Sequence, residues 1–390
     1  MLGGSEAAVI TGLGVIGPGG ESIEDLWAFL CDPRSRPPAH PGRIEFDPAA
    51  HLPRREARRM DRTTQMACAA ADAALGSAGD VGAPGEGGGV VIASAYGGLD
   101  SLAEGVLAVE RAGPSAVSPV YGTVFPVSAP AAAVAARAGW TGPSVGLAAT
   151  CASGTVAVAE AARRVIDGRC EVALAGGTEA PAIPAVVAAF ERLTVLCADR
   201  PRPFDVARDG FALTEGAAMV VVEDEERARA RGARPLARIL GAAERTDVAG
   251  VFAPSDEAAV LVACIRAALA DAWLDPSDVA HVNAHGTGTV ANDAAEAAAI
   301  VEVLGRGVPV TSIKGAMGHT GGAAGAFEVV AAALSIGHAE LPPTAGLEEI
   351  DPALGLDVVM GRPRPWTPGP IVSTSLGLGG QVAAIVLGPP

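Results

Sequence analysis

The chain between residues 146 and 155 reads Gly146-Leu147-Ala148-Ala149-Thr150-Cys151-Ala152-Ser153-Gly154-Thr155. From Ser144 to Thr150 the apolar side chains alternate, as they do in a strand. From Val156 to Ile166 they follow the spacing of a helix, which Gly168 closes. We therefore expect a tight turn from a strand into a helix, with Cys151 in the turn.

A cysteine in this position is a candidate nucleophile. A thiol in the first turn of a helix lies at the positive end of the helix dipole, which favours the thiolate. The free backbone N–H groups of that turn can also hold an oxyanion. The segment predicts a reactive Cys151 with a lowered pKa, although alone it equally fits a small buried core residue.

Composition limits the class of protein. The chain has 390 residues, of which 49% are hydrophobic, 4% are aromatic and 50 are glycine. Such a chain can bury a large core of small side chains, as one α/β domain or as two halves. The net charge of −16 argues against nucleic acid or an anionic membrane as a general partner.

The cysteines and the N-terminus indicate the compartment. The six cysteines show no CxxC pair and no metal-finger spacing, which is typical of reduced thiols. The first residues lack the basic and apolar regions of a signal peptide, and apolar stretches elsewhere are broken by proline, glycine or charge. We expect a cytoplasmic protein that binds no metal.

Strand and helix patterns alternate along the whole chain. The strands are expected at 7–11, 89–95, 171–175, 217–223, 281–284 and 308–313, and near Ile371 and Ala383. Helices are expected from Ser22 and over 255–273, 292–304 and 321–336. The pattern predicts a layered α/β fold with a buried sheet in each half, divided into residues 1–240 and 241–390.

A glycine motif near the N-terminus matches a nucleotide-binding pattern, but the residues that follow it do not fit a nucleotide site. Gly12-Leu13-Gly14-Val15-Ile16-Gly17 matches the pattern GxGxxG. A dinucleotide site needs a helix that begins on these glycines, whereas Pro18-Gly19-Gly20 prolongs the turn. We expect no dinucleotide cofactor.

Two histidines, His285 and His319, lie among glycines at expected strand ends. Neighbouring glycines let a ligand approach an imidazole closely, as acid–base or oxyanion chemistry requires. Alone, each could equally be a core residue or part of a turn. His281 lies four residues before His285, but the segment is a predicted strand without the glutamate of a zinc-binding helix.

Together these segments resemble the β-ketoacyl synthases of the thiolase superfamily, over nearly the whole chain. The matching motifs are Thr150-Cys151-Ala152-Ser153-Gly154, Asn283-Ala284-His285-Gly286-Thr287-Gly288-Thr289, Ile313-Lys314 with Gly318-His319, and Gly377-Leu378-Gly379-Gly380. The resemblance implies a duplicated five-layer αβαβα fold, usually dimeric, which needs no metal or organic cofactor.

The resemblance also implies roles for individual residues. Cys151 would accept an acyl chain from a thioester, and His285 and His319 would hydrogen-bond the carbonyl of a malonyl thioester during decarboxylation. Lys314 and Glu328 would form a buried ion pair that orders the histidines. The N–H groups of Cys151 and Leu378 would form the oxyanion hole.

Five positions depart from the family pattern. Thr150 replaces a small alanine, and Leu376 and Leu378 replace aromatic residues of the glycine loop. Thr214 occupies the position of a common glycine, and Gly315 that of a common serine. Leucine in place of a gating phenylalanine would change how acyl chains enter.

The implied partners are an acyl carrier protein and acyl and malonyl thioesters, in a homodimer or in a heterodimer with a chain-length-factor-like subunit. Because carrier proteins are acidic, docking would use basic islands, and two occur in the sequence. They are Arg54, Arg55, Arg58, Arg59 and Arg62, and Arg227, Arg229, Arg231 and Arg234. Such a cluster is more often only a solvated face, so docking is a hypothesis for each island.

The implied activity is a decarboxylating condensation in fatty-acid or type II polyketide biosynthesis. Two alternatives share the fold. One is a non-catalytic partner subunit of a ketosynthase heterodimer, which usually lacks the cysteine. The other is an acyltransferase that forms an ester or amide and uses Cys151 without decarboxylation.

Overall fold

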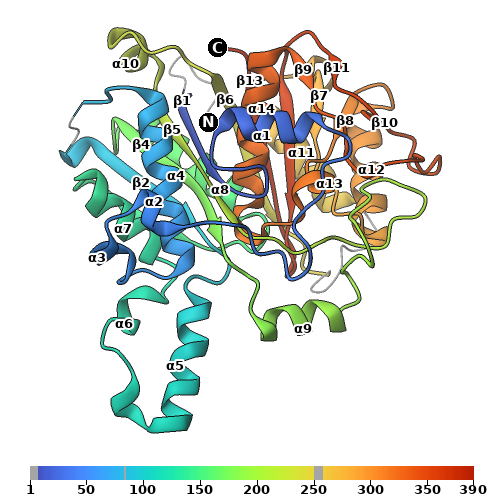
Figure 1. The fold of residues 1–390 in the computed structure, drawn as a ribbon. Helices are drawn as coiled ribbons and strands as arrows, with labels where there is room; N and C mark the ends of the chain where they lie inside the picture. The colour runs from blue at the N-terminus through green and yellow to red at the C-terminus, as the bar shows by residue number, and fades with distance from the viewer. Residues whose placement is uncertain (1–7, 83–84, 250–257) are drawn as a thin grey trace.

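A single hydrogen-bonded sheet of eleven strands runs through the protein (Figure 1). The computed structural model describes residues 8–82, 85–249 and 258–390. The N-terminal strands are β1 (Ala8–Ile16), β2 (Gly88–Ala93), β3 (Ser144–Leu147), β4 (Val172–Glu179) and β5 (Gly216–Asp224). The main C-terminal strands are β6 (Ala237–Thr246), β7 (His281–Asn283), β8 (Pro309–Thr311), β12 (Ile371–Leu376) and β13 (Gln381–Gly388). A short eleventh strand, β10 (Asp357–Val358), pairs with β8.

The strand order is the same in both halves. In the N-terminal half, β1, β5 and β4 are antiparallel neighbours, and β4, β2 and β3 follow as parallel neighbours. In the C-terminal half, β6, β13 and β12 are antiparallel, and β12, β7 and β8 are parallel. The predicted duplication is therefore confirmed by topology.

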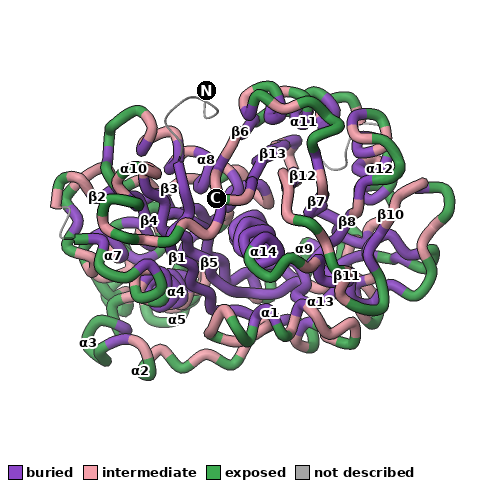
Figure 2. Tube along the Cα trace, turned by 90° about the horizontal axis from the view of Figure 1, so that it is seen from above, coloured by how far each residue is buried: buried purple, intermediate pink, exposed green. Residues whose placement is uncertain are grey.

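The two halves of the sheet meet at β1 and β6. These strands pair where Ala8 to Ile10 face Ala237 to Ile239, and beyond that point the halves separate to enclose helices. Figure 2 shows α14 (Ala324–His338) lying between them. The division that we predicted after residue 240 falls inside β6 and stays a prediction.

Helices complete five layers. The outer helices are α4 (Arg62–Ala78) and α7 (Ala129–Ala138) on the N-terminal side and α11 (Ala259–Asp271) and α12 (Val290–Leu304) on the C-terminal side. In the middle, α14 packs against α8 (Ser153–Ile166). Three apolar cores fill the spaces between the layers. Small side chains allow this close packing, since residues 324–336 of α14 are all buried. The predicted αβαβα fold class is confirmed.

The GxGxxG glycines serve packing. Gly12 and Gly14 lie in β1, which runs to Ile16 and not, as we expected, to Thr11, and Gly17 follows it. A Cβ on Gly12 would stand 2.3 Å from the carbonyl oxygen of Ala74 in α4, so these glycines allow strand and helix to touch. The helix predicted from Ser22 is α1 (Ile23–Cys31), and Ser22 caps it through a hydrogen bond from the N–H of Asp25.

Other elements lie at the periphery. The sequence pattern did not predict α5 (Leu99–Ala112) and α6 (Tyr121–Val124), which project from the body in Figure 1. Residues 255–257 of the helix predicted to begin at Ser255 lie outside the described residues. No helix in the described ranges is long and apolar enough to cross a bilayer. The remaining elements are α2 (Pro48–His51), α3 (Arg54–Ala57), α9 (Pro184–Arg192), α10 (Glu225–Ala230), α13 (Lys314–Met317), β9 (Glu340–Leu341) and β11 (Arg364–Pro365).

Candidate active site

Cys151 lies in the turn between β3 and α8. We expected it in the first turn of the helix, which is wrong, because α8 begins at Ser153. Thr150 has a φ of +47°. The hydroxyl of Ser153 donates to the carbonyl oxygen of Thr150 (2.6 Å) and accepts from the N–H of Ala149 (2.7 Å). Ser153 therefore fixes the turn that presents the sulfur.

The expected lowering of the Cys151 pKa is also wrong. Burial raises the pKa of this thiol to about 11, since a thiolate away from water loses its hydration. A hydrogen bond from the backbone N–H of Leu378 and the charge of Lys314 act in the opposite direction. The resting nucleophile is therefore a neutral thiol at pH 7 and must lose its proton when substrate binds.

His285 follows β7, as predicted, and it is buried. Nδ1 of its ring lies 3.1 Å from Nζ of Lys314, and its carbonyl oxygen accepts from the same ammonium (2.6 Å). Because an ammonium can only donate, Nδ1 accepts and the ring proton stays on Nε2. Burial, Lys314 and His319 hold the pKa of His285 well below its usual range.

His319 follows the short helix α13 and not, as we expected, a strand directly. Its Nδ1 accepts from the N–H of Gly321 (3.2 Å), so its ring proton is also on Nε2. The rings of His285 and His319 are 5.3 Å apart between centroids and nearly perpendicular. Burial and Lys314 lower the pKa of His319. Both imidazoles are neutral donors at pH 7.

Lys314 and Glu328 form an ion pair in the interior, as the resemblance implied. The second carboxylate oxygen of Glu328 accepts from the hydroxyl of Ser375 (3.2 Å), which lies 2.8 Å from the hydroxyl of Thr155 in α8. Burial raises the pKa of Glu328, and Lys314 opposes the rise. The pair thus links the histidines to the helix that follows the nucleophile.

Leu376 and Leu378 lie beside Cys151. Leu376 ends β12, and Leu378 lies in the turn of Gly377 to Gly380 that leads into β13. Both are half-buried. The five catalytic side chains and both leucines of the sequence-based prediction therefore gather in one place, although their functional roles stay predictions.

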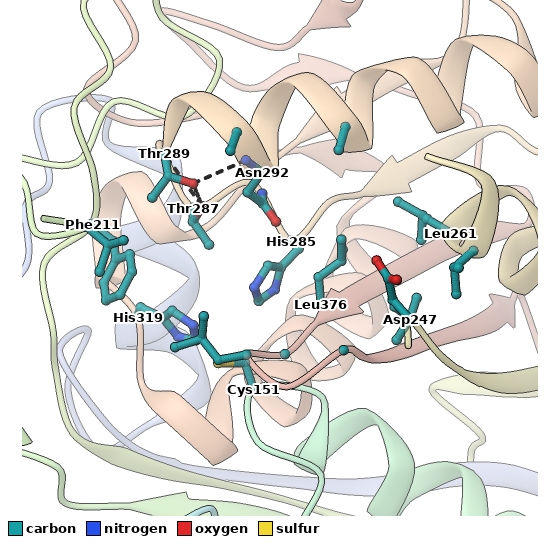
Figure 3. Close-up of a pocket in the computed structure, with 18 of the residues that line it drawn as sticks. Cys151, Phe211, Asp247, Leu261, His285, Thr287, Thr289, Asn292, His319 and Leu376 are labelled. Carbon is teal, nitrogen blue, oxygen red and sulfur yellow. Dashed lines mark hydrogen bonds between the residues drawn. The ribbon is translucent and has the colours of Figure 1, made fainter. Parts of the chain in front are cut away.

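A mainly apolar cavity of about 160 Å³ opens onto the sulfur and both histidines. Figure 3 shows Cys151, His285 and His319 together at this cavity, with Leu376 beside them. Polar groups are few in its lining and include Thr287 and Thr289. An apolar chain with a polar end fits such a site.

Two buried glutamates that support the site were missed as site residues. Glu296 accepts from the N–H groups of His285 and Gly286 (both 2.7 Å), and Glu179 accepts from the N–H groups of Ala95 (2.6 Å) and Gly322 (3.1 Å). Burial raises the pKa of each carboxyl to about 7. The signal available in the sequence was a carboxylate followed or preceded by small apolar residues, in Gly176-Gly177-Thr178-Glu179-Ala180 and in Ala294-Ala295-Glu296-Ala297-Ala298.

The described ranges contain no group of three or more His, Cys, Asp or Glu side chains that could hold a metal ion. The ring of His281 forms a hydrogen bond within the sheet, since its Nε2 lies 2.9 Å from the hydroxyl of Thr311 on the neighbouring strand.

The duplicated five-layer fold, with a buried Cys-His-His site beside a glycine loop, defines a condensing enzyme of the thiolase type. Comparison with known proteins specifies the family. Residues 40–228 match the family model for the N-terminal domain of β-ketoacyl synthase, and residues 236–348 match that for its C-terminal domain. The chain belongs to the β-ketoacyl synthase family.

Relatives align over almost their full length. The chain is 37% identical over 409 residues to the granaticin polyketide putative β-ketoacyl synthase 1 of Streptomyces violaceoruber, covering 97% of each chain. It is 34% identical over 399 residues to 3-oxoacyl-[acyl-carrier-protein] synthase 2 of Synechocystis, covering 96% of this chain and 95% of that one.

Solved structures show the same fold. The ishigamide ketosynthase/chain length factor matches with a TM-score of 0.91 and 32% identity, over 99% of each chain. AntDE:AntF, a type II PKS acyl-carrier protein in complex with its ketosynthase bound to the hexaketide, matches with a TM-score of 0.90 and 28% identity, also over 99% of each chain.

Proposed function

We propose that this protein joins an acyl group to a malonyl unit by decarboxylating Claisen condensation, in fatty-acid or type II polyketide biosynthesis. The observation that carries the proposal is the convergence of one thiol and two neutral imidazole donors on one cavity. Its substrates are an acyl thioester and malonyl-acyl carrier protein. Relatives in both kinds of biosynthesis support it.

In the first half-reaction, Cys151 attacks the carbonyl carbon of the acyl thioester. The carbonyl oxygen becomes an oxyanion, which the N–H groups of Cys151 and Leu378 stabilise. The bond to the carrier thiol breaks, and the departing sulfur takes up the proton that Cys151 gives up. Because that proton leaves with the carrier thiol, the high pKa of Cys151 is compatible with the reaction.

In the second half-reaction, the malonyl thioester loses its carboxylate as CO₂. The electrons of the broken bond move toward the thioester oxygen, where the Nε2–H groups of His285 and His319 stabilise the enolate. The α-carbon then attacks the acyl carbonyl on Cys151. The thiolate of Cys151 leaves and takes up one proton from solvent water, which balances the negative charge brought in by the malonyl carboxylate, and the elongated β-ketoacyl chain stays on the carrier.

The cavity supports an acyl chain of mainly apolar character. Its wall includes Leu261, Leu376 and Val382, whereas the hydroxyls of Thr287 and Thr289 lie among the few polar groups. Burial of apolar chain against such a wall contributes roughly 0.8 kcal/mol per CH₂ group. Leu376 and Leu378 have smaller side chains than the aromatic residues usual at these positions, so they leave a wider access to Cys151.

One of the two basic islands supports carrier-protein docking. Arg54, Arg55, Arg58 and Arg59 are exposed, on and just after α3. Arg62 belongs to the fold, because it pairs with buried Glu215 (2.6 Å). An exposed basic cluster on an acidic chain attracts an acidic carrier locally.

The second basic island is largely neutralised within the fold. Arg227 and Arg231 both pair with buried Glu223, and Arg229 pairs with Glu225. Three of its four arginines are therefore paired within the fold, and only Arg234 is exposed without an ion pair to a described residue, so the proposed docking surface is the cluster of Arg54, Arg55, Arg58 and Arg59.

The proposal includes a dimer. In the described part of the chain, β3 pairs only with β2 and leaves one edge of the sheet open, and such edges are commonly covered by another chain. In the same half of the chain, α5 exposes Leu102, Val106 and Val109 on one face, with Val106 52% exposed. The partner is a second copy or a chain-length-factor-like subunit.

We also propose a cytoplasmic location, which six free cysteines support.

Intact-mass measurement tests the proposal against the two alternatives. Wild-type protein is incubated with an acyl-carrier thioester, and the Cys151→Ala variant serves as the control. We expect an acyl adduct on the wild type alone, followed by release of CO₂ when malonyl carrier is added. No adduct on folded wild type would favour a non-catalytic partner subunit. An adduct without CO₂ release, with the acyl group passed to an alcohol or amine, would favour an acyltransferase.

A further inference from the structure

Thr150, the residue directly before Cys151, has a backbone conformation that its side chain disfavours. Its φ of +47° lies in the left-handed region, where β-branched residues are rare. Hydrogen bonds from the N–H (3.2 Å) and hydroxyl (2.6 Å) of Ser153 to the carbonyl oxygen of Thr150 maintain it. A smaller residue would be less strained at this position, so a contact of the threonine side chain has to account for Thr150.

The hydroxyl of Thr150 makes a long-range hydrogen bond. It donates to Oε1 of Gln381, which lies 3.1 Å away and 231 residues later in the chain. Gln381 is the first residue of β13, and its carbonyl oxygen accepts from the N–H of Gly377 (2.7 Å). The bond therefore joins the nucleophile turn to the residue that closes the glycine loop.

Thr150 also touches the loop directly. A Cβ on Gly377 would stand 1.9 Å from Oγ1 of Thr150, so the loop backbone rests against this hydroxyl. On the other side, a Cβ on Gly380 would stand 2.1 Å from the carbonyl oxygen of Asp247, whose N–H donates to the carbonyl oxygen of Gly380 (2.7 Å). The loop thus lies between Thr150 and the backbone at Asp247.

We propose that Thr150 is a positioning residue, whose hydroxyl holds Gln381 and thereby sets where the glycine loop places the N–H of Leu378 over Cys151. The inference rests on the proposed function for the catalytic use of that N–H. In the free protein the same N–H lowers the pKa of Cys151, against the larger effect of burial. Loss of the Thr150 hydroxyl should move the N–H away and shift thiolate formation to higher pH.

The test is the pH dependence of Cys151 alkylation by iodoacetamide, followed by peptide mapping because the chain has six cysteines. For Thr150→Ala we expect a profile displaced to higher pH and alkylation about threefold to tenfold slower at neutral pH, the loss of one hydrogen bond. Thr150→Ser keeps the hydroxyl and should retain the wild-type profile.

Thr194→Ala is the matched control. Thr194 also has a positive φ (54°), but its hydroxyl donates to the neighbouring carbonyl oxygen of Leu193. This variant removes a threonine side chain from a left-handed position without breaking a hydrogen bond to the glycine loop, and we expect it to leave the alkylation profile unchanged.

Gln381→Met removes the same bond from the other side, so the inference stays testable if Thr150→Ala does not fold. Hydrogen exchange of the segment 376–381 should be faster in Gln381→Met and Thr150→Ala, but not in Thr150→Ser. The inference would be overturned if Thr150→Ala and wild type had equal pH profiles of Cys151 alkylation. It would also be overturned if the alanine and serine variants lost alkylation rate equally. Neither measurement uses a carrier protein or malonyl thioester, so both outcomes are independent of whether condensation occurs.

Discussion

Lys314 and Glu328 form their ion pair with almost no access to water, since their side chains are 1% and 0% exposed. Two buried charges are stabilised only while both are present and hydrogen-bonded. The remaining donors of Lys314 go to His285, and the second oxygen of Glu328 accepts from Ser375. The pair therefore combines a structural role with control of the His285 tautomer.

Removal of the lysine should separate these two roles. Lys314→Met leaves the Glu328 carboxylate unpaired, and we expect the free energy of unfolding to fall by about 3–5 kcal/mol. The double variant Lys314→Met/Glu328→Gln removes both charges and should recover much of that loss, as measured by urea denaturation. Decarboxylation of malonyl carrier should stay about 100-fold slower in both variants, because His285 has lost the donor that fixes its Nε2 proton. Recovery of activity in the double variant would contradict this role.

The depressed pKa values of the two histidines predict the response to acid. Burial, with Lys314, keeps His285 and His319 neutral at and below pH 6.5. The unfolded chain takes up protons at these residues below about pH 6.5 and the folded chain does not, so the contribution of the two histidines to stability is complete above that pH and declines below it. Glu179 and Glu296, whose pKa is raised to about 7, change the stability in the opposite direction over the same range. Malonyl decarboxylation should show no inflection near pH 6.5.

The variant His285→Gln isolates the contribution of His285 to this decline. Its free energy of unfolding should fall less than that of the wild type between about pH 7 and pH 5. Parallel declines would mean that His285 is protonated in the folded protein.

Local signals explain what the sequence could predict of the site. The turn at Cys151 and the loop at His285 each follow a strand and contain small residues within a few positions. Lys314 and Glu328 are fourteen residues apart, and the family resemblance supplied their pairing. The duplicated fold was likewise predictable, because strand and helix patterns recur in both halves.

Properties that depend on distant contacts were not predictable. The pKa of Cys151 is raised mainly by burial among segments far apart in the chain, against the opposing effects of the Leu378 N–H and Lys314. Glu179 bonds to Ser94 and to Gly322, 85 and 143 residues away. The bond from Thr150 to Gln381 spans 231 residues. Each side chain was visible in the sequence, but its partner was not.

Reversal of the charges at Arg58 and Arg59 should weaken carrier-protein docking. Both side chains are exposed. For Arg58→Glu/Arg59→Glu we expect KM for malonyl carrier to rise by about tenfold at low salt, with kcat little changed, and the effect to shrink as salt rises. Arg229→Glu is the matched control, since this exposed arginine is paired with Glu225. An unchanged KM in the double variant, or an equal rise in the control, would place the docking surface elsewhere.

A charge on the exposed face of α5 should prevent dimerisation. Leu102, Val106 and Val109 follow helical spacing on an element that projects from the body (Figure 1). We expect wild-type protein to sediment as a dimer and Val106→Glu to sediment as a folded monomer, because an unpaired carboxylate is costly to bury in an apolar contact.

Trp273→Glu is the control for this experiment. Trp273 is another exposed apolar residue (70%), but it lies beyond the end of α11, in the C-terminal half. This variant should remain dimeric. A dimeric Val106→Glu variant would exclude α5 as the contact. The wild type could instead be monomeric alone and associate only with a co-expressed sister subunit. If Val106→Glu abolishes that association, α5 is the contact of a heterodimer, because the same apolar face is buried whichever subunit covers it.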